Sequence, residues 1–172
     1  PAETSLIATM GHHEAETISR PTIAVISTGD ELVQPGTDLS AGQIYESNSY
    51  GLASLVEKMG ASAKRFDVVH DNIEGLRVTL DEAADSCDAI LTSGGVSMGE
   101  WDLVRRLMED EGETLFWKIL IRPGGPPLCG SWKGTPLFGL PGNPVSSHVV
   151  FLSLVAPWLA QCMGADSELG PR

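Results

Sequence analysis

The stretch Ile23-Ala24-Val25-Ile26-Ser27-Thr28-Gly29-Asp30 decides the fold class of this chain. Its first half is a continuous apolar run rich in β-branched residues, which is typical of a strand buried on both faces. Its second half consists of small and polar residues that signal a turn. Because a strand covered on both faces needs a helical layer on each side, this stretch predicts an α/β domain.

The same alternation of apolar run, turn and helix recurs along the chain. It predicts further strands at 63–69, 88–92, 114–121, 128–132 and 136–139, and helices at 48–59, 74–86, 101–110 and 145–162, the last with a possible kink at Pro157. This order predicts a three-layer α/β/α fold with a mostly parallel, mixed sheet. We expect residues 21–164 to form this domain, residues 1–20 to be a connector from a preceding domain, and residues 165–172 to be a tail or linker stub.

Composition narrows the class of protein. The chain has 172 residues, of which 42% are apolar and 20% charged, so it is long enough for one well-packed domain. No uninterrupted apolar run approaches the roughly 20 residues of a membrane span, and three scattered cysteines without a CxxC pair indicate reduced thiols in a cytoplasmic protein. The net charge of −12 argues against a nucleic-acid partner. Neither a membrane nor a nucleic acid is expected as a partner.

Three segments rich in Gly, Ser or Asn follow predicted strands, at 27–31, 93–100 and 139–144. Parallel strands end at one edge of a sheet, where glycine-rich turns and helix starts can bind an anion through backbone N–H groups. One such turn alone is an ordinary tight turn, but three at one edge indicate a broad polar ligand carrying phosphate. The GxxxxGK[ST] and helix-opening GxGxxG nucleotide signatures are absent. The candidate ligand-binding residues, including the helix start at 47–48, are Thr28, Gly29, Asp30, Ser47, Asn48, Gly94, Gly95, Val96, Ser97, Pro141, Gly142, Asn143 and Pro144.

Carboxylates recur beside these turns, at Asp30, Glu31, Asp71, Glu100 and Asp102. Brought together, they could hold Mg²⁺ through oxygen ligands or move protons. The alternative is that acidic residues at helix starts complement the helix dipole, which would explain Asp30 and Glu100 more readily than Asp71 and Asp102.

Basic residues are few, so their placement is informative. Lys118 lies on the predicted strand 114–121, and Arg122 follows directly after its end, four residues later. Their side chains would share one face of the strand and could together bind a phosphate or another oxyanion. A surface ion pair is the alternative for Lys118.

Several of these motifs together resemble one family. They are Ser-Thr-Gly-Asp-Glu-Leu (27–32), Gly-Gln-Ile-Tyr-Glu-Ser-Asn (42–48), Ser-Gly-Gly-Val-Ser-Met-Gly-Glu (93–100) with Asp102, Phe-Trp-Lys (116–118) and Gly-Leu-Pro-Gly-Asn-Pro-Val-Ser (139–146). In this order, over about residues 21–164, they resemble the molybdopterin molybdenumtransferases, the family of MoeA and of the E domain of gephyrin. The resemblance covers the central molybdopterin-binding domain, which has a MogA-like fold.

The resemblance implies a function in molybdenum cofactor biosynthesis. Family members insert molybdate into adenylylated molybdopterin and release AMP, with Mg²⁺ or another divalent cation. It implies that Glu31, Asp71 and Asp102 are the functional and metal-binding carboxylates, that Lys118 and Arg122 line the pocket, and that Ser97 lies near molybdate. It further implies a homodimer for the longer protein, whose partner subunit completes the site, and contact with the adenylyltransferase upstream in the pathway.

Two features depart from the family pattern. Gly125 stands where the family usually has a lysine that helps to hold molybdate, and the chain lacks the flanking domains, so we expect weak binding and poor turnover from it alone. Two other functions stay open. One is a molybdopterin adenylyltransferase of the same fold, which is disfavoured because residues 94–97 read Gly-Gly-Val-Ser where that family characteristically has Gly-Gly-Thr-Gly. The other is a non-catalytic molybdopterin-binding module, which the replacement of the lysine by Gly125 would suit.

Overall fold

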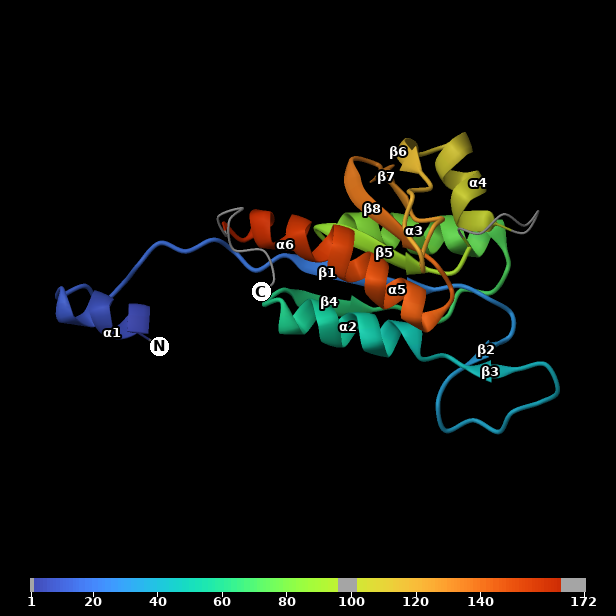
Figure 1. The fold of residues 1–172 in the computed structure, drawn as a ribbon, viewed down its shortest axis with the longest axis horizontal. Helices are drawn as coiled ribbons and strands as arrows, with labels where there is room; N and C mark the ends of the chain where they lie inside the picture. The colour runs from blue at the N-terminus through green and yellow to red at the C-terminus, as the bar shows by residue number, and fades with distance from the viewer. Residues whose placement is uncertain (1, 96–101, 165–172) are drawn as a thin grey trace.

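The structure, a computed structural model, describes residues 2–95 and 102–164, and at its centre is a six-stranded mixed sheet (Figure 1). The strand order is β4-β1-β5-β8-β7-β6, in which β4, β1, β5 and β8 are parallel and β7 runs antiparallel to β8 and β6. The strand bounds are β1 Thr22–Ser27, β4 Ser62–Arg65, β5 Ala89–Ser93, β6 Glu113–Trp117, β7 Leu128–Trp132 and β8 Thr135–Leu140. The predicted α/β fold with a mostly parallel, mixed sheet is confirmed.

Helices cover both faces of the sheet and divide the core into two clusters. One layer contains α3 (Ile73–Ser86) and α4 (Leu103–Asp110); the other contains α2 (Asn48–Lys58) and the continuous run of α5 (Pro144–Val150), η1 (Phe151–Val155) and α6 (Ala156–Cys162). Successive side chains of β1 alternate between the layers: Ala24 and Ile26 pack under α3 and α4, and Ile23 and Val25 under α2 and the long run. This alternation explains why every residue of β1 from Ile23 to Ile26 is apolar.

The helices match their predicted ranges within two residues, whereas two strands end earlier than predicted. The predicted strand 63–69 stops at Arg65, after which only Val69 returns to bridge Thr28. The predicted strand 114–121 stops at Trp117, because Lys118 has a φ of 71°, a left-handed conformation that a strand cannot contain.

The long C-terminal run accommodates Pro157 without breaking. Proline has no N–H for the carbonyl four residues before it, and its ring crowds that carbonyl. Over Phe151–Val155, just before the proline, the helix widens into π-helical geometry. The predicted irregularity near Pro157 therefore takes the form of a π-helical stretch inside a continuous helix.

By length and composition the run Pro144–Cys162 could cross a membrane, with a mean hydropathy of 1.4. The sequence contains no uninterrupted apolar run of that length. The helix is nevertheless apolar enough on average to span a membrane, because few of its residues are polar. Its apolar character has another physical reason here, since Val150, Phe151, Val155 and Leu159 are buried against the sheet.

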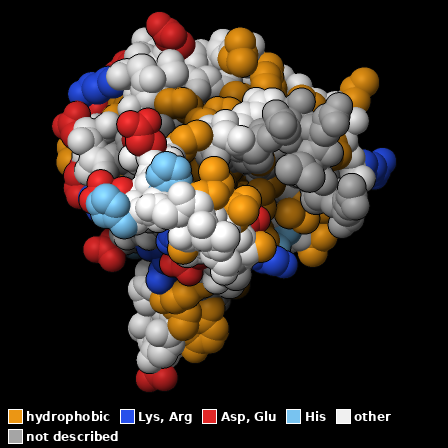
Figure 2. All heavy atoms as spheres, turned by 90° about the vertical axis from the view of Figure 1, so that its left-hand side faces the viewer, with side chains coloured by type: hydrophobic (Ala, Val, Ile, Leu, Met, Phe, Trp, Pro, Cys, Tyr) orange, Lys and Arg blue, Asp and Glu red, His pale blue; other side chains and the backbone are white. Residues whose placement is uncertain are grey.

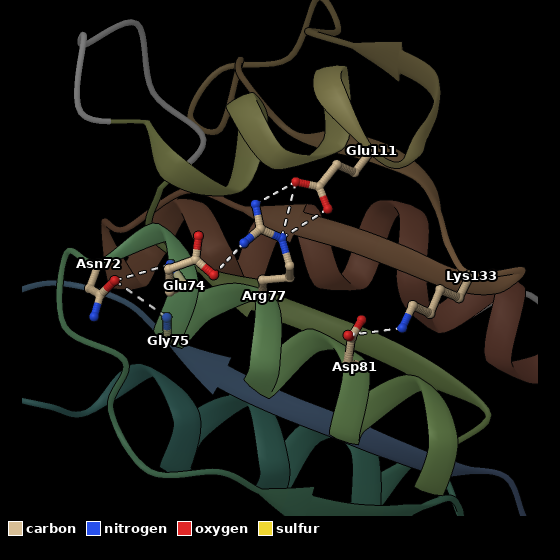
Figure 3. A network of polar contacts seen from close by, with 7 residues as sticks. All are labelled: Asn72, Glu74, Gly75, Arg77, Asp81, Glu111 and Lys133. Carbon is tan, nitrogen blue, oxygen red and sulfur yellow. Dashed lines mark hydrogen bonds and ion pairs between the residues drawn. The ribbon is translucent and has the colours of Figure 1, made fainter.

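Polar contacts fasten α3 to its neighbours (Figure 3). The Arg77 guanidinium forms a two-pronged ion pair with Glu111, just after α4, through Nε to Oε2 at 2.9 Å and through its terminal nitrogen to Oε1 at 2.5 Å. Asp81 accepts hydrogen bonds from Lys133 Nζ and Trp132 Nε1, both at 2.8 Å. These contacts join α3 to α4 and to the β7–β8 turn.

Two segments leave the body of the domain. Helix α1 (Ala2–Thr9) buries no residue and lies apart at the end of an extended segment (Figure 1). Strands β2 (Leu32–Val33) and β3 (Ile44–Tyr45) pair in parallel and form a lobe, residues 31–46, that the sequence analysis did not predict. Figure 2 shows this lobe as the protrusion at the bottom, with hydrophobic side chains along it; Leu39, Ile44 and Tyr45 are exposed there.

Candidate functional site

The three glycine-rich turns predicted from the sequence lie in contact at one edge of the sheet. The backbone N–H of Thr28 donates to the Ser93 carbonyl at 3.1 Å, and that of Gly94 donates to Leu140 at 3.1 Å. At Gly142 a Cβ would lie 3.7 Å from the Cα of Gly94, so the second and third turns are in van der Waals contact. The carboxyl ends of β1, β5 and β8 therefore bring the turns to one place, where ligands bind in open α/β sheets.

A cavity of about 230 Å³ opens where these turns meet. Its walls come from the three turns, the β2–β3 lobe, the start of α2 and the loop before α3. The lining residues are Thr28, Gly29, Glu31, Leu32, Ile44, Tyr45, Glu46, Ser47, Asn48, Asp71, Ser93, Gly94, Gly95, Gly142 and Pro144. Ten residues that the sequence analysis selected are among them: Thr28, Gly29, Glu31, Ser47, Asn48, Asp71, Gly94, Gly95, Gly142 and Pro144.

Two of the three predicted metal-binding carboxylates, Glu31 and Asp71, share the cavity. Burial and the negative charges of Asp30 and Glu31 raise the pKa of Asp71. Carboxylates that repel one another in this way favour a cation between them. No group of three His, Cys, Asp or Glu side chains within 2–95 and 102–164 is close enough to form a complete metal site. The expected trio of Glu31, Asp71 and Asp102 is therefore not assembled as a protein-only site.

Asp102 lies apart from the cavity lining, at the start of α4. It is only 5% exposed, and neither of its carboxylate oxygens has a hydrogen-bond partner of good geometry among the described residues. Burial raises the pKa of Asp102 to about 7, partly opposed by the backbone N–H and the charge of Arg105. The N–H of Arg105 itself donates to the Gly95 carbonyl at 3.3 Å, which links the start of α4 to the second turn.

Among the described residues, the cavity lining contains no Lys or Arg. Positive potential there comes instead from helix starts: α2 begins at Asn48 and the long helical run begins at Pro144, and both residues line the cavity. The side chain of Ser47, the residue before α2, makes no capping bond and lines the cavity as well. An anion in this cavity would therefore be held by backbone N–H groups and hydroxyls rather than by basic side chains.

Lys118 and Arg122 do not form the anion-binding pair that the sequence predicted. Because the strand ends at Trp117, Lys118 and Arg122 do not share one strand face, and neither lines the cavity. The Lys118 ammonium lies 4.1 Å from the centre of the Trp117 ring, where Arg105 also lies, at 3.8 Å. Arg122 is exposed on the irregular segment before β7.

Most of the remaining predicted residues form hydrogen bonds that stabilise the loops and the helix start around the cavity. Asp30 is exposed and accepts from the N–H of Asp71 at 2.9 Å, with His70 Nδ1 at 3.3 Å. Asn143 caps the long helical run by accepting from the N–H of Ser146 at 3.1 Å, and the Pro141 carbonyl accepts from Ser147 Oγ. Val96 and Ser97 lie outside the described residues.

Five lining residues were not among the candidates: Ser93, although it begins the predicted segment 93–100, and Leu32, Ile44, Tyr45 and Glu46. The apolar members belong to the lobe, whose parallel two-residue pairing leaves no periodic signal. Glu46 accepts from the N–H of Ser49, but it precedes the N-cap Ser47 and glutamate is not a preferred capping residue, so no capping signal marked it.

The fold and the cavity together define an α/β domain with a candidate ligand-binding site at the carboxyl edge of its sheet. The family profile described as "probable molybdopterin binding domain" matches residues 24–161. The chain belongs to this family.

Named relatives are longer than this chain. It is 38% identical to the molybdopterin molybdenumtransferase of Haemophilus influenzae over 95% of its own length and 41% of the relative, and 39% identical to molybdopterin molybdenumtransferase 2 of Mycobacterium tuberculosis, covering 44% of it. The crystal structure of the molybdopterin biosynthesis MoeA protein of Pyrococcus horikoshii superposes with a TM-score of 0.85 at 36% identity, over 95% of this chain and 40% of that one. The chain thus spans about two fifths of these proteins.

Proposed function

We propose that this chain is the molybdopterin-handling domain of a molybdenumtransferase, which inserts molybdate into adenylylated molybdopterin with release of AMP. The observation that carries the proposal is the cavity in which three glycine-rich turns meet two carboxylates at the carboxyl edge of the sheet. Membership of the molybdopterin-binding family and the names of the longer relatives support it.

The carboxylates fit a divalent cation that completes its shell with ligand oxygens. Mg²⁺ commonly takes one or two carboxylates and fills its other positions with waters and substrate phosphates. Glu31 and Asp71 would supply those carboxylates, and the cation would neutralise phosphate charge during cleavage of the phosphoanhydride. The raised pKa of Asp71, caused in part by Asp30 and Glu31, supports a cation at this place.

The phosphates would be held by the starts of α2 and of the long helical run, together with the hydroxyls of Thr28, Ser47 and Ser93. These neutral donors suit a protein with a net charge of −12, because they provide local positive potential without basic side chains. Asp102, whose pKa burial raises to about 7, would exchange a proton near neutral pH beside the second turn.

The test is release of AMP from adenylylated molybdopterin in the presence of Mg²⁺ and molybdate. We expect slow release by this chain, reduced at least tenfold in Glu31→Gln and Asp71→Asn. Asp67→Asn, on the same loop but outside the cavity, is the matched control and should behave as the wild type. Equal rates in Asp71→Asn and wild type would contradict the assigned site, and a rate equal to that of a full-length family member would contradict the expected poor turnover.

The same assay separates the two alternatives. Consumption of ATP with unmodified molybdopterin would identify an adenylyltransferase. Ligand binding without AMP release would identify a non-catalytic module. One observation favours the module: Gly125 stands where the family usually has a lysine, and a Cβ added there would make a tight contact, 3.3 Å, with the Ile121 carbonyl oxygen.

We further propose that the longer protein is a cytoplasmic homodimer that receives its substrate from the adenylyltransferase. The small cavity supports the need for a second subunit, since about 230 Å³ is below the usual range of roughly 300–1,000 Å³ for ligand sites. Sedimentation of the full-length protein with and without ligand would test the dimer.

A further inference from the structure

We infer that residues 46–49, which we name the latch, hold the three turns of the cavity together, and that Glu46 and Asn48 are positioning residues. Each turn is bonded to the latch. Ser27, the last residue of β1 and the first of the first turn, donates its hydroxyl to Glu46 Oε1 at 2.9 Å. The Asn48 amide nitrogen lies 2.7 Å from Ser93 Oγ at the second turn and 2.7 Å from the Gly142 carbonyl oxygen at the third.

Glu46 is the fixed point of the latch. It is 1% exposed, yet its carboxylate is fully compensated: Oε1 also accepts from the N–H of Ser49 at 2.7 Å, and Oε2 accepts from Ser49 Oγ at 2.7 Å. Arg65, at the end of β4, places its guanidinium 3.7 Å from Oε2 and donates through Nε to Ser49 Oγ at 2.8 Å. A buried carboxylate with this many partners is held in one position, because moving it would leave a charge unpaired.

Asn48, two residues after Glu46, holds the other two turns in place relative to Glu46. The orientation of its amide is fixed, since the Gly142 carbonyl only accepts hydrogen bonds and must face the nitrogen. The amide oxygen Oδ1 is buried and has no partner among the described residues. Both hydrogens of the Asn48 amide nitrogen are therefore bonded within the protein, and its oxygen Oδ1 is buried. We infer that Asn48 connects the turns and does not contact a ligand.

The latch explains how turns that are far apart in the sequence keep one cavity open without a ligand. Ser27, Ser93 and Gly142 lie at the ends of three different strands, and each forms a hydrogen bond with the same four-residue segment. The inference rests on the proposed function only for the consequence that loosening the latch weakens ligand binding.

The first experiment measures amide hydrogen exchange in the ligand-free chain. Glu46→Gln and Asn48→Ala should speed exchange at least tenfold in peptides that contain residues 91–95 and 139–143. Glu111→Gln is the matched control, because it also removes a carboxylate from an arginine but lies just after α4 and does not line the cavity. Unchanged exchange at the turns in both latch variants would overturn the inference, and Asn48→Ala keeps the test valid if Glu46→Gln does not fold.

The second experiment measures binding of adenylylated molybdopterin to Asn48→Ala, Glu46→Gln and the double variant, below the unfolding temperature of all three. A latch predicts that the double variant binds no more than about twofold more weakly than the weaker single variant. Independent, multiplying losses would show that Asn48 contacts the ligand directly and would overturn its positioning role. If the wild type binds no pterin while the exchange result holds, the proposed function fails and the latch stands.

Discussion

A Cβ atom added to Gly94 would lie 2.8 Å from the carbonyl oxygen of Thr28, closer than such atoms approach in proteins. Gly94 also has a φ of 92°, which side chains other than glycine rarely adopt. The first two turns can therefore meet only because this position is glycine.

Gly94→Ala should lower the free energy of unfolding by about 3 kcal/mol, from backbone strain and from the contact with Thr28. Gly36→Ala is the matched control, since Gly36 has a φ of 94° but nothing within 4 Å of the added Cβ. It should lose only about 1 kcal/mol. Urea unfolding of both variants measures the difference, and equal losses would show that the contact with Thr28 contributes nothing.

Asp102→Asn should stabilise the protein at alkaline pH. The folded pKa of Asp102 is about 7, above the ordinary value of a carboxyl group, so the native state holds a proton that the unfolded chain releases. Stability is therefore lost as the pH rises from about 4 through 7. The variant should be about 2 kcal/mol more stable than wild type at pH 8 and equally stable at pH 4. Urea unfolding without divalent cations measures both, and a gap that does not change with pH would refute the assignment.

Glu111→Gln should destabilise the protein at neutral pH but not at acidic pH. The hydrogen bonds and charge of Arg77 lower the pKa of Glu111 (Figure 3), so this carboxylate stabilises the fold above its unfolded pKa and loses that effect as the pH falls through the folded pKa. The melting temperature of the variant should lie below that of wild type at pH 7, and the two should converge below about pH 4. Parallel melting curves across this range would contradict the role of the ion pair.

Lys118→Gly should separate stability from ligand binding. Glycine relieves the φ of 71° at this position while the contact with Trp117 is lost, so the free energy of unfolding should change by less than about 1 kcal/mol. If Lys118 leaves Trp117 to reach the bound ligand, the affinity for adenylylated molybdopterin should fall about tenfold. Lys133→Gly, at a φ of 49° in the β7–β8 turn, is the control and should bind as wild type. Equal affinities of both variants would exclude Lys118 from the site.

The cavity shows where sequence reasoning succeeded and where it stopped. Thr28, Gly94 and Gly142 were recognisable because each follows an apolar strand, and parallel strands deliver their ends to one edge. Lys118 was misplaced because a single left-handed residue, which no pattern announces, ended the strand before it. Ile44 and Tyr45 were missed because strands of two residues have no periodicity to detect.

The sequence by itself determined the α/β class, the helices and the three turns, because hydrophobic periodicity and glycine placement are local properties of the chain. Only the tertiary structure decided that Glu31 and Asp71 share a cavity while Asp102 lies beside it, and that Glu46 and Asn48 join the turns. Those relationships depend on hydrogen bonds between residues 19 to 94 positions apart, which form only when the packed sheet brings the strand ends together.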